Sequence, residues 1–235
     1  MSPGGPAGGP PGAGSAARPP AGIVLAGGRS TRMGTSKAAL RWDGATLLAR
    51  TCAILARAVG GPLLVVGSPG RELPALPPGV RAVADPKEGR GPLQGLATGL
   101  AAVASAADVA FVCATDLPFL QAAFVRRVLA ALGAQVDLAL PVVRGRPQPL
   151  AAAYRTAVTP LAEARLARGD LRLLGLAAEV CVARLDEAAL LSDPALAAAD
   201  PALRSVVNVN DPAAYAAARR RVGRDGPALP LGEEG

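Results

Sequence analysis

The chain has 235 residues, of which 51% are hydrophobic and only 3% aromatic, and its formal net charge is +7 with no histidine. This length predicts one α/β domain with a sizeable core, because two independent domains would each be small. The missing histidine excludes Ser-His-Asp and Cys-His catalysis, and three scattered cysteines without C-x-x-C spacing argue against a zinc site or a disulfide framework.

The positive charge is weak evidence for a nucleic-acid partner. The arginines are scattered, and the aromatic side chains on which bases would stack are almost absent. No apolar run reaches the roughly 18–20 residues that span a bilayer, and residues 1–20 lack the apolar region of a secretory signal. We therefore predict a cytoplasmic protein with neither a membrane nor a nucleic-acid partner.

Composition divides the chain into one domain and two tails. The Gly-, Pro- and Ala-rich ends predict a disordered tail over 1–20 and a flexible tail over 223–235, which leaves a single domain over 21–222. Within that domain, short apolar runs alternate with longer Ala- and Leu-rich segments. This pattern is typical of βα units around a mostly parallel sheet with helices on both faces, a Rossmann-like α/β fold.

The elements of the first half follow this alternation. Strands are predicted over 23–26, 63–66, 81–84 and Val109–Ala114, and helices over 47–59, 93–106 and 121–132. The strand Val109–Ala114 is apolar throughout, which predicts a central position in the sheet.

The second half changes character. Strands over Leu138–Val143 and 150–154 are expected to pair through a turn at 144–147, a small antiparallel excursion. Helices are predicted over 158–168 and 171–178, and a strand over 180–185. Asp211 and Pro212 form an N-cap and first-turn pair for a last helix over 213–221.

The loop after the first predicted strand has the composition of an anion-binding loop. Residues 25–37 read LAGGRSTRMGTSK. The backbone N–H groups of Gly27 and Gly28 can surround an anion, and Arg29, Arg32 and Lys37 add charge suited to a triphosphate. The spacing fits neither a Walker A loop nor the G-x-G-x-x-G fingerprint. An ordinary glycine-rich βα turn is the alternative.

This loop resembles the L-A-G-G-x-S-x-R-M-G-x-x-K-x-x-L signature of the nucleotidyltransferase superfamily, in the version carried by molybdenum cofactor guanylyltransferases (MobA-like proteins). The matching residues are Leu25, Ala26, Gly27, Gly28, Ser30, Arg32, Met33, Gly34, Lys37 and Leu40. Sugar-nucleotide and isoprenoid-pathway relatives usually read A-A-G-x-G-x-R-M, so Ala26-Gly27-Gly28 favours the molybdenum branch. The resemblance implies that residues 25–28 and Lys37 bind the nucleotide and that Arg32 and Lys37 are catalytic.

Asp116 lies just past the apolar strand Val109–Ala114. Ligands in open α/β sheets bind outside the carboxyl ends of the strands, where a carboxylate can hold a hard cation. A helix N-cap is the alternative role. The resemblance favours the metal, because the family reads C-D-x-P-[FY]-L here and its aspartate ligates Mg²⁺; this chain has Thr115 in place of the frequent cysteine.

Three further segments resemble the family. Asp85 and residues 91–96 fit D…G-P-L-x-G-[LM], which implies that Asp85 and Gly91 lie against the nucleotide, although an aspartate before proline is also a common turn residue. Asn208 and Asn210 fit an N-V-N segment and are candidates to contact the metal or the second substrate, although asparagines also cap and turn. Residues 146–154 resemble a stretch on the pterin side.

The resemblance implies a Mg²⁺-dependent transfer of GMP from GTP to the terminal phosphate of molybdopterin, with release of pyrophosphate. The nucleophile is already an anion, so a general base is not needed, which fits a chain without histidine. Transient contacts with molybdoenzymes or cofactor chaperones are also implied. Some members carry a base-contacting asparagine where this chain has Val66-Gly67-Ser68, so guanine specificity rests on the resemblance alone.

Three alternatives remain open at this point. The chain could be a cytidylyltransferase for molybdopterin, a nucleotidyltransferase for another phosphorylated metabolite, or a nucleotide-binding protein without catalytic activity.

Overall fold

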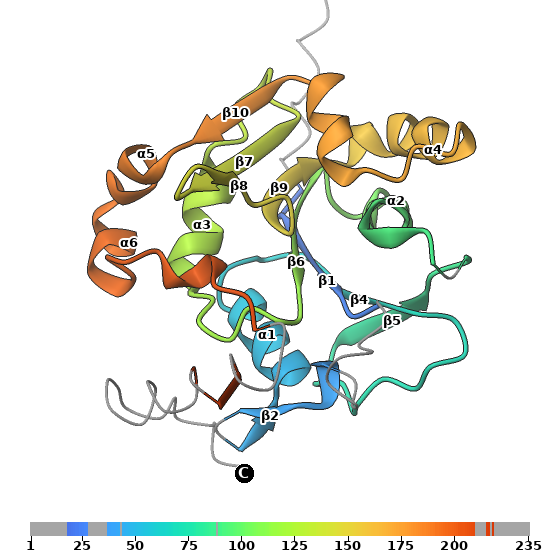
Figure 1. Ribbon diagram of the computed structural model, residues 1–235, viewed down its shortest axis with the longest axis horizontal. Coiled ribbons are helices and arrows are strands. Elements are labelled where there is room, and N and C mark those ends of the chain that lie inside the picture. The colour runs from blue at the N-terminus through green and yellow to red at the C-terminus, as the bar shows by residue number, and fades with distance from the viewer. Residues whose placement is uncertain are drawn as a thin grey trace, which may run out of the picture.

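The computed structural model describes residues 18–27, 37–42, 44–87, 89–209, 215, 216 and 218, apart from the side chain of Lys37. Within these residues the chain forms an α/β fold around one mixed sheet (Figure 1). The described part contains no helix long and apolar enough to cross a membrane.

The main sheet has eight strands in the described part, with the path β10-β7-β9-β6-β1-β4-β5 and β8 paired to β7. Their bounds are β1 Ala21–Leu25, β4 Leu63–Gly67, β5 Val80–Ala84, β6 Val109–Ala114, β7 Leu138–Val143, β8 Arg146–Pro147, β9 Ala151–Arg155 and β10 Val182–Leu185. The strands β6, β1, β4 and β5 are mutually parallel, whereas β9 is antiparallel to both β6 and β7. The predicted sheet, its central apolar strand β6 and its antiparallel excursion are confirmed.

The excursion differs in one detail from its prediction. Only Arg144 and Gly145, both with positive φ, form the turn after β7, and Val143 then pairs with Arg146 in the short β8. The chain leaves β8 and enters β9, which occupies the place between β6 and β7. A separate two-stranded sheet pairs β2, Arg41–Trp42, with β3, Ala45–Thr46.

Helices cover both faces of the sheet (Figure 1). One face carries α1 Leu47–Ala56, α3 Ala122–Ala130, α5 Glu187–Leu191 and α6 Pro194–Ala199, and the other carries α2 Gly91–Val103 and α4 Thr159–Ala167. Alternate residues of each strand face opposite layers, so Val24 of β1 packs under α1 while its neighbours Ile23 and Leu25 pack under α2. These two apolar layers hold the strand ends in fixed positions.

Short helices depart most from the sequence prediction. Residues 171–178 form only a 3₁₀ helix, η3 Leu173–Ala178. A Cβ on Gly175 would clash with Nη2 of the buried Arg165, so the guanidinium lies directly against this glycine. The helices α5 and α6 were missed because they are five and six residues long, although Asp186 and Asp193 cap their first turns. The other 3₁₀ turns are η1 Lys37–Ala39, η2 Thr156–Val158 and η4 Arg204–Val206.

The two ends of the domain are only partly described. Arg18 donates to the carbonyls of Ala104 and Ser105 and pairs with Asp108, so residues 18–20, assigned above to the tail, pack on the domain. The helix predicted over 213–221, with its cap at Asp211 and Pro212, lies largely outside the described residues. The disordered and flexible tails remain predictions.

Candidate active site

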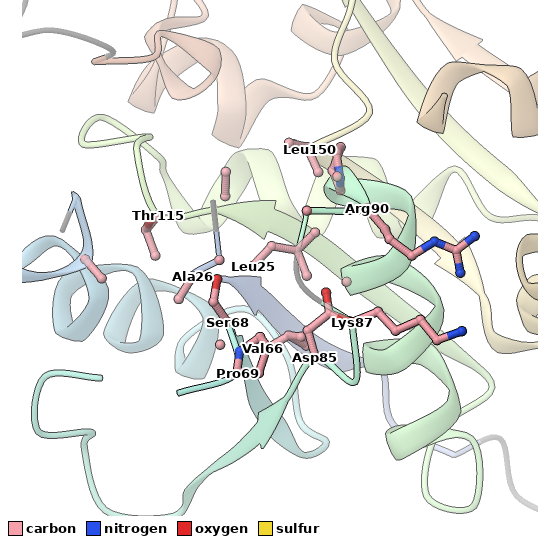
Figure 2. A pocket seen from close by; sticks show the side chains of 18 of the residues that line it. Leu25, Ala26, Val66, Ser68, Pro69, Asp85, Lys87, Arg90, Thr115 and Leu150 are labelled. Carbon is pink, nitrogen blue, oxygen red and sulfur yellow. The ribbon is translucent and has the colours of Figure 1, made fainter. Parts of the chain in front are cut away.

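A pocket of about 430 Å³ opens at the carboxyl ends of the parallel strands (Figure 2). Its walls come from the segments that follow β1, β4, β5 and β6 and from the first turn of α2. The chain builds outward from β1 through β4 to β5, and then returns to β6 on the other side of β1. Ligand crevices form at such a reversal of strand order, because the loops on its two sides diverge.

Gly27 begins the glycine-rich loop in close contact with the segment after β4. A Cβ on Gly27 would lie 3.1 Å from the hydroxyl oxygen of Ser68, and the Ala26 N–H donates to the Val66 carbonyl at 2.8 Å. Leu25, Ala26, Gly27 and Ser68 all line the pocket. The described start of the predicted nucleotide loop therefore lies where a ligand would bind.

Asp116 lies across the pocket, just beyond β6. Its carbonyl accepts a hydrogen bond from the Val209 N–H at 3.0 Å, and α1 reaches the same loop through a bond from Arg50 Nε to the Pro118 carbonyl at 3.0 Å. The next helix, α3, has Gln121 as its N-cap residue. Asp116 is thus not a helix cap, which removes the alternative role considered from the sequence.

Asp85 forms part of the wall at the end of β5, and its N–H donates to the Gly67 carbonyl at 2.8 Å. Its Oδ1 is buried and has no hydrogen-bond partner among the described residues. Burial raises the pKa of the Asp85 carboxyl; hydrogen bonds from the Lys87 backbone and the Thr98 side chain and the charge of Arg90 partly oppose this shift. The residue therefore holds a turn and also places a carboxyl group at the pocket wall.

The first turn of α2 completes this wall. Gly91 has a φ of +70°, which a residue with a side chain rarely adopts, and α2 has no side-chain cap at its N-terminus. A Cβ on Gly95 would lie 3.4 Å from Leu25 and 3.9 Å from Oδ2 of Asp85. Both glycines of the G-P-L-x-G pattern therefore allow close approach at the pocket.

Arg90 and Lys87 also line the pocket and were not assigned to a site from the sequence. Figure 2 shows their side chains extending to the same side of the view, past Asp85. Arg90 precedes the recognised G-P-L motif directly, and Lys87 is one of only two lysines. Those positions are the signals that could have drawn attention to them.

Several predicted site residues either lie outside the described residues or do not line the pocket. Gly28, Arg32 and Asn210 lie outside the described residues, and only the backbone of Lys37 is described, at the start of η1. Asn208 is described but exposed, and it is not among the residues that line the pocket. Its neighbour Val209 is buried and carries the hydrogen bond to Asp116.

The donor groups fit a divalent cation shared with phosphate. Among the described residues, no three His, Cys, Asp or Glu side chains gather into a complete metal site. Mg²⁺ typically takes one or two protein carboxylates and completes its shell with water and substrate phosphates. Asp116, half-buried at the pocket wall, supplies a carboxylate of this kind.

The doubly wound sheet, with a pocket and carboxylates at the carboxyl ends of its strands, defines the chain as a protein of the α/β nucleotidyltransferase class. Residues 22–182 match the family model described as the MobA-like NTP transferase domain. The chain belongs to this family.

Known relatives agree with this assignment. The chain is 37% identical over 162 residues to a probable molybdenum cofactor guanylyltransferase of Mycobacterium tuberculosis H37Rv, covering 67% of this chain and 79% of that protein. The fold of the present chain is similar to that of molybdopterin-guanine dinucleotide biosynthesis protein A from Archaeoglobus fulgidus, with a TM-score of 0.64 and 19% identity. The match covers 87% of the present chain and 100% of the A. fulgidus chain. A manganese complex of Rv0371c from M. tuberculosis is a further structure of this fold, with a TM-score of 0.54, 20% identity, and 71% and 86% covered.

Proposed function

We propose that this chain transfers GMP from GTP to the terminal phosphate of molybdopterin, releasing pyrophosphate, and so makes a guanine dinucleotide form of the cofactor. The observation that carries the proposal is one pocket that joins the start of the glycine-rich loop to Asp85, the α2 N-terminus and Asp116. The family assignment and the 37% identity to a probable molybdenum cofactor guanylyltransferase support it.

In the proposed reaction, a phosphate oxygen of molybdopterin forms a bond to the α-phosphorus of GTP. The bond from that phosphorus to the oxygen bridging to the β-phosphate breaks, and pyrophosphate leaves. The nucleophile is already deprotonated at neutral pH, so the protein contributes position and charge rather than a general base. This role fits a chain that contains no histidine.

Mg²⁺ is the proposed metal, and Asp116 is its proposed protein ligand. When bound, the ion neutralises charge on the phosphate oxygens. Arg32 and Lys37 are proposed to act on the triphosphate, with Gly27 and Gly28 lining it through their backbone. Asn208 and Asn210 remain candidates to contact the second substrate or the metal, since Val209, between them in the sequence, donates a hydrogen bond to the Asp116 carbonyl.

The carboxyl group of Asp85, at the pocket wall, supports guanine as the base. Guanine presents N1–H and a 2-amino group side by side, and a carboxylate accepts hydrogen bonds from both. At the corresponding edge, the exocyclic amino group is the only donor of cytosine and of adenine, and a ring-nitrogen acceptor lies beside it, which a carboxylate would meet unfavourably. We further propose that the reaction takes place in the cytoplasm and that molybdoenzymes or cofactor chaperones contact the protein transiently.

A nucleotide panel tests the function. Purified protein with Mg²⁺ and reduced molybdopterin is supplied with GTP, CTP or ATP, and pyrophosphate release is followed. We expect release with GTP. Release with CTP alone would assign the chain to the cytidylyl branch, and release with none of the three would favour a non-catalytic nucleotide-binding protein.

Asp116→Asn tests the proposed metal ligand. We expect it to lower kcat about 10²–10³-fold, the usual effect of losing one preorganised charge. Asp108→Asn is the matched control, because Asp108 lies just before β6, at the other end of the strand, and makes an exposed ion pair with Arg18. If both variants kept the activity of the wild type, Asp116 would not hold the metal.

A further inference from the structure

Arg90 is an arginine fixed in place at the wall of the pocket. Its Nη2 donates to the Leu166 carbonyl near the end of α4, and its Nη1 lies 3.4 Å from Oε1 of Gln94, a residue that is 8% exposed. Arginine carries five N–H donors on a rigid plane, so these two contacts leave further donors for a ligand. A side chain already held loses little conformational entropy when it binds.

Position along the sheet indicates which part of a nucleotide Arg90 would contact. Three strand spacings separate β6 from β5, and at about 4.8 Å each they place the segments after these strands about 14 Å apart. If Asp116 after β6 holds the metal and phosphates, the base extends toward β5. Asp85 and Arg90 both line the pocket at that end.

The two side chains present opposite hydrogen-bonding chemistry. Asp85 places a carboxyl group, a hydrogen-bond acceptor when ionised, at the pocket wall, and Arg90 is close enough to contribute to the electrostatics of that carboxyl. Guanine has donors at N1 and the 2-amino group and acceptors at O6 and N7, and arginine typically binds O6 and N7 together. Adenine has an amino group beside N7 in place of O6, and this donor would face a donor of the guanidinium, which is unfavourable.

We propose that Arg90 reads the base of the nucleotide, donating to O6 and N7 of guanine, while Asp85 accepts from N1–H and the 2-amino group. This inference rests on the proposed function, because it takes GTP as the nucleotide and the Asp116 end as the phosphate end. It gives this chain a guanine-selecting arginine at the β5 end of the pocket.

The test compares ligands that differ at single atoms. Binding of GTP, 7-deaza-GTP and CTP, each with Mg²⁺, is measured by calorimetry for the wild type and for Arg90→Ala. We expect the wild type to prefer GTP over 7-deaza-GTP by about tenfold, and Arg90→Ala to bind the two equally. The preference is a ratio within one variant, so a general loss of affinity cancels.

Three further variants sharpen the result. Arg81→Ala is the matched control, because Arg81, like Arg90, donates to the carbonyl of a helix residue (Ala102 in α2, at 3.3 Å) but does not line the pocket; it should keep the preference. Lys87→Ala should also keep it. Arg90→Lys retains one donor and the charge, should fold even if the alanine variant does not, and should show an intermediate preference.

Each contrary outcome is distinct. A tenfold preference that survives in both Arg90 variants, or that disappears in Lys87→Ala instead, overturns the assignment of Arg90. An equal loss of affinity for GTP, 7-deaza-GTP and CTP in Arg90→Ala assigns the guanidinium to the phosphates and overturns base reading. A wild type that binds none of the three overturns the proposed function, and this inference with it.

Discussion

The carboxyl group of Asp85 lies at the wall of the pocket, and one of its oxygens is buried in the protein. Its burial and the unpartnered Oδ1 disfavour the charged form in the protein without nucleotide. The Lys87 backbone and the charge of Arg90 act in the opposite direction without cancelling the shift. Asp85 thus keeps one buried oxygen without a hydrogen-bond partner among the described residues.

This environment predicts how stability depends on pH. The pKa of Asp85 is raised in the folded protein, so the folded state binds more protons than the unfolded state above the ordinary carboxyl pKa of 3.8. The contribution of Asp85 to stability is therefore fully present below that value and is lost as pH rises through the folded pKa. We expect Asp85→Asn, without nucleotide, to melt at a higher temperature than the wild type at neutral pH, because it removes the carboxylate that burial disfavours.

Thermal unfolding between about pH 3 and pH 8 checks this expectation. The difference between Asp85→Asn and the wild type should vanish at the acid end. Asp186→Asn is a suitable control, since Asp186 is an exposed residue that caps α5 outside the pocket. A variant that melts below the wild type at neutral pH would contradict the account of Asp85.

At the scale of elements, the contact between α2 and the sheet positions one wall of the pocket. A Cβ on Gly99 would lie 2.7 Å from Cγ2 of Ile23 and 3.2 Å from Cγ2 of Val66. Glycine at this point lets α2 lie directly on β1 and β4, and the same helix presents Gly91 and Gly95 to the pocket. The approach of α2 to the sheet therefore sets how far its first turn stands from Asp85.

We expect Gly99→Val to destabilise the protein by about 1–3 kcal/mol, because the extra atoms push α2 away from the sheet. The affinity for GTP should fall as well, since Asp85 and the α2 N-terminus separate. Gly133→Val is the control: a Cβ there meets nothing within 4 Å. Denaturant unfolding and nucleotide titration measure both effects, and equal stability of the two variants would contradict this role for Gly99.

At the scale of the whole molecule, a third apolar cluster joins segments far apart in the chain. Trp42 is 1% exposed and packs with Leu47 and Val209. Its ring lies 5.6 Å from that of Phe119, beyond Asp116, and 5.8 Å from that of Tyr215. The cluster therefore connects the segment after the glycine-rich loop, the Asp116 loop and the last described residues.

Because the chain has one tryptophan, its fluorescence reports on this cluster. We expect Val209→Asp to shift the emission of Trp42 to longer wavelength and to destabilise the protein by about 2–4 kcal/mol, since it buries a charge beside an indole. Asn208→Asp adds the same charge one residue away at an exposed position and should leave the emission unchanged. An unchanged spectrum for Val209→Asp would show that Val209 does not cover Trp42 in solution.

Local patterns in the sequence predicted much of this protein. Alternating apolar runs are enough to predict βα units, and β6 was correctly placed in the middle of the sheet because a strand buried on both faces must be apolar throughout. The motif around Leu25–Gly27 predicted the family, which the comparison confirms. The short helices α5 and α6 were not predicted, because they contain too few residues to show a helical hydrophobic period.

The sequence by itself determined the fold class and the family, and it predicted that Asp85, Gly91 and Asp116 belong to one site. Only the tertiary structure decided that Ser68, Lys87 and Arg90 share their pocket. None of these three residues belongs to a motif of this chain that matches the family. They reach the pocket because parallel strands bring the loops after β1, β4, β5 and β6 to one edge of the sheet, and because α4 holds the Arg90 guanidinium from a point 76 residues further along the chain.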